Sequence, residues 1–237
     1  MLKGKGAITL MWAICRHEYV RLFKSIKSLI TIAFIVGVSY WVSDLVNRAA
    51  AFVPAQDLAQ GHALGIFTLI MLLGPLFVFS LSHDVINREL AGRTMRFLVT
   101  RTSRNQIVLG KFLGVVCFWL SCLAITFGVV LVTVHTFDGK TFWQCLSLLV
   151  YCISLALLLS LVVPRPSYTM FLGIVAAMLL PGLGLWSTFS DHPAAQWIAY
   201  LTPFVFMEKG GAWIGFIWLY AALFLGASMY LFQRRDC

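Results

Sequence analysis

The stretch DVINRELAGRTMRFLVTRTSRNQIVLGK, residues 84–111, separates two long apolar runs of the chain. It holds six basic residues against two acidic ones, namely Arg88, Arg93, Arg96, Arg101, Arg104 and Lys111 against Asp84 and Glu89. The flanking runs have about 20 residues, the length that an α-helix needs to cross the hydrocarbon core of a bilayer. The stretch is therefore predicted to be a polar loop that joins two membrane spans.

The composition supports this interpretation. Hydrophobic residues make up 60% of the chain, charged residues only 11%, and the mean hydropathy is +0.89. Soluble globular domains have about 25% charged residues, so we predict an all-α polytopic membrane protein in which residues 1–237 form a single transmembrane domain. The net charge of +9 lies mostly at the ends of apolar runs, where topology rules place basic residues. Membrane lipids are therefore expected as partners, and no nucleic acid.

Six apolar runs are predicted to span the membrane: residues 29–46, 62–82, 107–134, 142–163, 168–186 and 212–232. Pro75 lies within the second run and removes a backbone hydrogen bond there, which predicts a kink. Pro181 and the glycines that follow it should break the outer part of the fifth span. The apolar run within residues 191–211 is too short to span, so we expect a re-entrant or interfacial hairpin before the last span.

Residues 7–26 precede the first span and show two helical faces. The apolar face has Ile8, Trp12, Cys15, Tyr19, Leu22 and Ile26, and the polar face has His17, Arg21, Lys24 and Ser28. This pattern predicts an amphipathic helix in the membrane interface, with Trp12, Arg16, Arg21 and Lys24 as its lipid-contacting residues. A solvated helix before the first span is the alternative.

The polar loop itself contains two helix signals. Ile86, Leu90, Thr94 and Phe97 follow helical spacing, and Glu89 is expected to pair with Arg93 one turn further on. This short helix should end near Val99. Ser103 and Gln106 then form the pattern of a capping box, which predicts the start of the next helix.

The basic residues predict the orientation of the chain. With six spans, fifteen of the eighteen Lys and Arg residues fall on the side of the two termini and three on the other, whereas the acidic residues divide four to five. Basic residues are enriched in cytoplasmic segments. We therefore expect both termini and the loop 84–104 on the cytoplasmic face of the cell (inner or plasma) membrane.

The apolar runs lack the groups that catalysis or ion coupling needs. Residues 112–137, 141–164 and 210–233 contain no Asp, Glu, Lys or Arg, whereas ion-coupled transporters place such groups at membrane depth. Gly139-Lys140-Thr141 ends like a phosphate loop, but Val134 stands where the first glycine is needed. The six cysteines show no metal-ligand spacing. We expect no catalytic residue, metal or cofactor on this chain and no enzyme activity of its own.

Residues 89–114, ELAGRTMRFLVTRTSRNQIVLGKFLG, resemble a segment of type-2 ABC exporter permeases. In that family a glutamate, a glycine–threonine step, a serine–arginine pair and a glycine–lysine pair recur in this order; here they are Glu89, Gly92 and Thr94, Ser103-Arg104 and Gly110-Lys111. The sequence departs from the family in Arg93, which separates Gly92 from Thr94, and in Thr102, where a proline is usual. Residues 201–204 and 232–236 support the resemblance.

The resemblance implies a function. Two six-span permease subunits, copies of one chain or different chains, would form a pathway, and each would dock a separate ATPase subunit that binds ATP and Mg²⁺. The loop 84–104 would supply the coupling helix, with Arg88, Glu89, Leu90, Arg93, Arg96 and Phe97 as docking residues. Pro75 and Pro181 would shape a pathway lined by the second and fifth spans. The apolar lining suits export of an amphipathic peptide, drug or lipid-like molecule.

The residues alone leave a second hypothesis open. A non-transporting membrane scaffold or assembly factor would also present a basic loop to a cytoplasmic partner, and the same arginines could bind anionic lipid head groups. An intramembrane enzyme is disfavoured because the spans lack polar catalytic groups. The transporter hypothesis predicts that Glu89→Arg or Phe97→Asp uncouples transport without unfolding the spans.

Overall fold

The computed structural model describes residues 2–48, 55–92, 95, 99–100, 102–135, 137–163, 165–190 and 192–234. Within these ranges the chain is helical and has no β-strand. Six helices are long and apolar enough to cross a membrane: α2 (Ile26–Arg48), α3 (Ala55–Ser82), α6 (Arg104–Val134), α7 (Gly139–Val162), α8 (Pro166–Phe189) and α11 (Ile214–Arg234). The predicted all-α polytopic fold with six transmembrane helices is confirmed.

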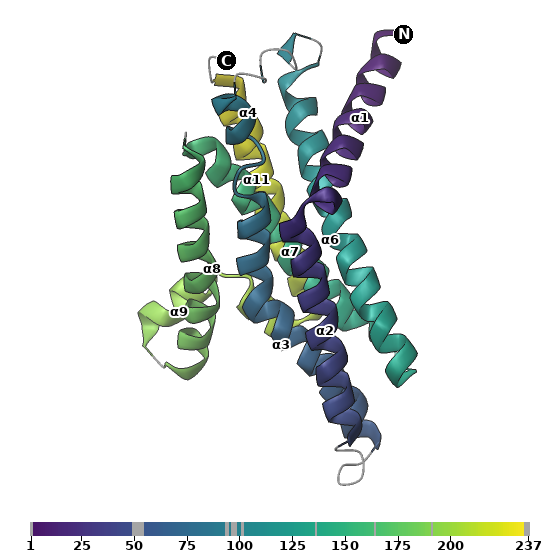
Figure 1. The fold of residues 1–237 in the computed structure, drawn as a ribbon. Helices are drawn as coiled ribbons and strands as arrows, with labels where there is room; N and C mark the ends of the chain where they lie inside the picture. The colour runs from purple at the N-terminus through teal and green to yellow at the C-terminus, as the bar shows by residue number, and fades with distance from the viewer. Residues whose placement is uncertain are drawn as a thin grey trace.

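Helix α7 is the central element of the bundle. It packs against α3, α6, α8 and α11, and Figure 1 shows it behind and between them. Its buried side chains include small residues such as Ser147, Ser154 and Ala156, which let neighbouring helices approach closely. Because α7 carries no charged side chain between Thr141 and Val162, it can be enclosed on nearly all sides without an unpaired charge.

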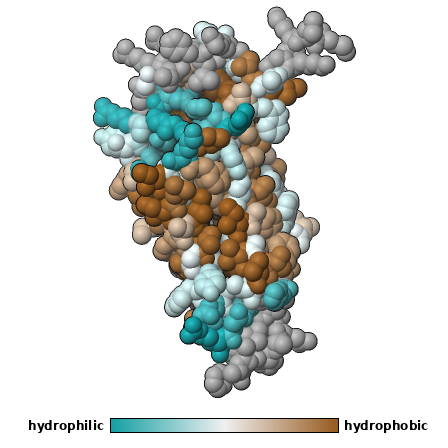
Figure 2. Space-filling view, turned by 45° about the vertical axis from the view of Figure 1, so that its right-hand side comes forward, coloured by the Kyte–Doolittle hydropathy of each residue, from teal (hydrophilic) through white to brown (hydrophobic). Residues whose placement is uncertain are grey.

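The face of the molecule seen in Figure 2 has three zones. Figure 2 shows an apolar belt between two polar ends. Large apolar side chains such as Val132, Phe171 and Leu223 are exposed within the long helices. In a soluble protein such a belt would be unfavourable, whereas hydrocarbon solvates it at no cost. The belt therefore fits a multi-pass membrane protein.

Helix α1 (Leu2–Lys24) lies beside α6 and is separated from α2 by Ser25 alone. Its backbone approaches α6 at two glycines: a Cβ on Gly110 would lie 2.8 Å from the Met11 carbonyl oxygen, and one on Gly114 would lie 2.7 Å from that of Cys15. The 31 residues of α6 make a helix of about 46 Å, longer than the roughly 30 Å hydrocarbon core. Its first turns can thus hold α1 near one polar end.

The bundle encloses only part of the apolar face that the sequence defines on the N-terminal helix. Cys15 and Leu22 are buried, but Ile8, Trp12 and Ile26 are exposed, and the charged Glu18 is buried in their place. The buried face is turned because α1 packs along α6 at Gly110 and Gly114, where its backbone rather than its largest apolar side chains makes the closest contact. The location of α1 relative to lipid stays a prediction.

The remaining helices are short. Helix α4 (Asn87–Ala91) follows α3, and α9 (Pro193–Ala199), α10 (Phe204–Lys209) and the 3₁₀ turn η2 (Gly211–Trp213) join α8 to α11. The start of α1, the end of α11 and α4 lie at one end of the molecule (Figure 1). Helix α8 continues through Pro181 to Phe189, so the predicted break in the fifth span is wrong; Pro181 is accommodated within a continuous helix.

Candidate functional site

The segment that leads into α4 is bonded to two membrane helices. Ser160 of α7 accepts hydrogen bonds from the backbone nitrogens of Ile86 and Asn87, both at 3.1 Å. The Asn87 side-chain amide donates to Thr169 Oγ1 of α8 at 2.7 Å and to the Val163 carbonyl at 3.3 Å. Asn87 is 0% exposed. These bonds fix the start of α4 against the end of α7 and the start of α8.

A network of buried charges joins α4 to α1 and α6. Lys111 Nζ of α6 lies 2.6 Å from Glu89 Oε1 and 3.6 Å from Glu18 Oε2, and Glu18 also pairs with Arg21 on the next turn of α1. Glu18 and Lys111 are each 1% exposed. Two carboxylates and two cations balance within this ion network of Glu18, Arg21, Glu89 and Lys111. A buried charge requires such pairing because its desolvation is costly.

The network gives Glu89 a partner inside the bundle. It was predicted as a docking residue that pairs with Arg93; its carboxylate pairs with Lys111, and the pairing with Arg93, which lies outside the described residues, stays a prediction. Leu90 likewise packs against the core. Arg88, in contrast, is exposed and lies 3.7 Å from Asp84. Three predicted docking residues fall outside the described residues: Arg93, Arg96 and Phe97.

The residues expected to contact lipid lie mainly on the free side of α1. Trp12, Arg16 and Lys24 are exposed, whereas Arg21 is half-buried on Glu18.

Burial raises the pKa of the Glu18 carboxyl, and the opposing effect of Lys111 and Arg21 does not cancel it. Burial and the neighbouring Cys117 thiol raise the pKa of Cys15 to about 11. The face of α1 toward α6 is thus enclosed.

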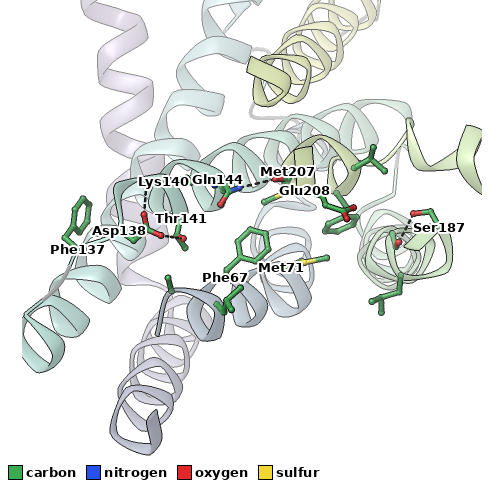
Figure 3. A pocket seen from close by; sticks show the side chains of 16 residues that line it. Phe67, Met71, Phe137, Asp138, Lys140, Thr141, Gln144, Ser187, Met207 and Glu208 are labelled. Carbon is green, nitrogen blue, oxygen red and sulfur yellow. Dashed lines mark hydrogen bonds between the residues drawn. The ribbon is translucent and has the colours of Figure 1, made fainter. Parts of the chain in front are cut away.

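A cavity of about 750 Å³ lies at the opposite end of the molecule from α4. It is bounded by α3, the start of α7, the end of α8 and α10, and Phe67 and Met71 project into it from α3 (Figure 3). Gly184 and Phe204 both belong to its wall, and they are packed so closely that a Cβ on Gly184 would lie 2.6 Å from the Phe204 ring. Pro75 and Pro181 are buried, and neither lines this space.

The polar groups of the cavity lie around its apolar walls. Asp138 accepts hydrogen bonds from the Lys140 backbone nitrogen at 3.0 Å and from Thr141 Oγ1 at 2.6 Å, which caps α7. Hydrogen bonding to Thr141 lowers the pKa of Asp138. Gln144 Nε2 donates to the Met207 carbonyl at 3.1 Å, and Glu208 lies at the border. Apolar walls with a few polar groups are typical of sites for small amphipathic molecules.

The six long apolar helices agree with a comparison against protein families. Residues 12–237 match the family model described as "ABC-2 family transporter protein". The chain belongs to the ABC-2 transporter family. It is accordingly a membrane permease of an ABC transporter and a membrane subunit that is not itself catalytic. A search of curated proteins gives no match.

Several residues of this permease escaped sequence reasoning. Asn87, Ser160 and Thr169 are uncharged polar residues that belong to no motif of the sequence, so only the folded chain brings them together. Glu18 was assigned to neither face of the N-terminal helix, although its carboxylate is buried. One signal was present: the Gly110–Gly114 pair indicated close helix packing, and Lys111 lies beside it.

Proposed function

We propose that this ABC-2 permease docks a separate ATPase through residues 84–104 and exports an amphipathic molecule. The observation that carries the docking role is the two-sided character of α4. One side is fixed in the bundle through Asn87 and Glu89, while Arg88 faces solvent at the end of the molecule. An exposed arginine on a firmly held helix suits a partner groove with acidic groups, because arginine is favoured in interfaces.

The proposed orientation places α4 and both termini in the cytoplasm. It is supported by the excess of Lys and Arg on that side of the chain and by the common end of α1, α4 and α11 (Figure 1). The ATPase subunit, expected in two copies, would bind ATP and Mg²⁺. A second permease subunit, a copy of this chain or a different one, would complete the transporter in the cell membrane.

The proposed cargo class is supported by the cavity. Its walls include Leu64, Phe67 and Met71, and polar groups of α7 and α10 lie at its borders. A molecule with an apolar body and polar ends would match both parts. Because the cavity lies at the end away from α4, the proposal is that cargo occupies it on the outward side of the pathway.

Purification from native membranes in mild detergent tests the docking role. Chains that co-purify are identified by mass spectrometry, and ATP hydrolysis is measured. Arg88→Asp should release the ATPase subunit. Arg48→Asp is the matched control, since both arginines are exposed and pair with an aspartate four residues earlier, and Arg48 lies at the other end of the molecule.

A near-stoichiometric subunit with a phosphate loop, lost in Arg88→Asp and kept in Arg48→Asp, is the expected result. A preparation without ATPase, repeated in lipid nanodiscs, would overturn the proposal and favour a scaffold. Glu89→Arg is not a clean docking test, because it also breaks the ion pair with Lys111.

A further inference from the structure

Lys111 is the one residue in the ion network that contacts both α4 and α1 from a third helix. Its ammonium lies 2.6 Å from Glu89 Oε1 and 3.6 Å from Glu18 Oε2. Glu89 directly follows Arg88, and α4 has only five residues. Such a short helix moves as a unit, so any displacement of Arg88 by a docked partner displaces Glu89 as well.

The neutral hydrogen bonds and the ion pair that hold α4 respond differently to such a displacement. The Asn87 amide donates two hydrogen bonds, and a hydrogen bond is lost once donor and acceptor separate beyond about 3.5 Å. The attraction between Lys111 and its carboxylates falls only as the inverse of distance, and it is strong where water is excluded. Lysine also has a flexible four-carbon side chain with three donors. The ion pair therefore persists over movements that break the neutral bonds.

We infer that Lys111 is a positioning residue that transmits displacement of α4 to α1 and α6 through its shared pairing with Glu89 and Glu18. This inference rests on the proposed function, because the docked ATPase supplies the displacement. When Glu89 moves, Lys111 either follows it or shifts toward Glu18. In both cases the force reaches α1, which is continuous with the first span except at Ser25.

The first part of the test uses the permease alone in nanodiscs. Amide hydrogen exchange is measured for wild type, Lys111→Met, Glu89→Gln and the exchanged pair Glu89→Lys with Lys111→Glu. Lys27→Met, an exposed lysine outside the network, is the control. We expect exchange in both α4 and α1 to accelerate severalfold in the two single variants. In the exchanged pair, exchange should return toward wild type in α4 but stay fast in α1, because the carboxylate introduced at position 111 would face Glu18.

The second part uses the complex with its ATPase subunit. We expect Lys111→Met and Glu89→Gln to bind the ATPase in wild-type amounts and to leave the KM for ATP unchanged, because ATP binds to the partner. The kcat of hydrolysis should change severalfold, since the permease no longer follows the docked helix. The exchanged pair should not restore kcat, because it does not renew the pairing with Glu18, whereas a pair that only held α4 in place would recover with the exchange.

The outcomes separate the inference from the proposed function. Unchanged exchange in α1 of Lys111→Met would overturn the inference, whether or not an ATPase binds. Wild-type kcat in both single variants would also overturn it. A wild-type permease that purifies without any ATPase would overturn the proposed function and the transmission role together. The exchange data would still show whether Lys111 links α4 to α1. If Lys111→Met does not fold, Glu89→Gln and the exchanged pair decide the question.

Discussion

At the scale of single residues, the Asn87 side-chain amide joins three segments of the chain. It is fully enclosed and donates to Thr169 and to the Val163 carbonyl. We predict that Asn87→Ala lowers the free energy of unfolding by about 1–3 kcal/mol, since a buried hydroxyl and a carbonyl each lose a donor. A lower melting temperature in detergent checks this, with the exposed Asn47→Ala as control. Equal melting temperatures for the two variants would contradict the prediction.

Glu18 predicts a dependence on pH. Burial raises the pKa of its carboxyl above the usual 4.5, so the folded chain binds a proton that the unfolded chain releases. The free energy of unfolding then increases as the pH falls toward that usual value. Between about pH 7 and about pH 5, we expect the melting temperature of wild type to rise relative to that of Glu18→Gln.

The control for this titration is Glu208→Gln, which removes an exposed carboxylate outside the network. Its melting temperature should follow that of wild type over the same range. A constant difference between wild type and Glu18→Gln at every pH would show that Glu18 does not titrate there.

At the scale of helices, α6 offers a matched pair of glycines. A Cβ on Gly114 would meet the Cys15 carbonyl oxygen at 2.7 Å, whereas one on Gly128 meets nothing within 4 Å. We predict that Gly114→Ala lowers stability by about 1–3 kcal/mol through overpacking, and that Gly128→Ala raises it by up to about 1 kcal/mol through helix propensity. Thermal unfolding of both variants is the measurement, and the same sign for both would refute the packing of α1 on α6.

The spanning helices could be predicted because each needs only a long apolar run and polar ends. The start of α6 was also predictable: Ser103 and Gln106 form the expected capping box, and the Ser103 nitrogen donates to Gln106 Oε1 at 3.3 Å. The buried face of α1 was not, because sequence patterns assign a glutamate to water. Only the fold supplies Lys111 as its partner, 93 residues further along the chain.

Pro181 illustrates the same limit within one helix. Its ring removes one hydrogen bond, which predicts a break when the helix is considered alone. In a bundle, neighbouring helices offset that loss, and α8 continues to Phe189. The cavity also could not be predicted from the sequence, because Gly184 of α8 and Phe204 of α10 meet only after the hairpin folds back.

At the scale of the whole molecule, the proposed orientation predicts which surfaces meet which compartment. We expect a cysteine at His192, near the hairpin of α9 and α10, to react with an impermeant maleimide added outside intact cells. A cysteine at Arg88 should react only after the membrane is opened. Both side chains are exposed. Labelling of Arg88→Cys in intact cells would reverse the orientation and remove the docking proposal.

Glu18 also sets an order of events during synthesis. At about 5–20 residues per second, Lys111 leaves the ribosome roughly 5–20 seconds after Glu18. Until then Glu18 has only Arg21 as a partner among the four residues of the network. The N-terminal helix therefore cannot take its final place until the third span has been made. The amphipathic pattern of residues 7–26 suits this waiting period, because a helix with Trp12 on one side and charges on the other can rest at the bilayer surface.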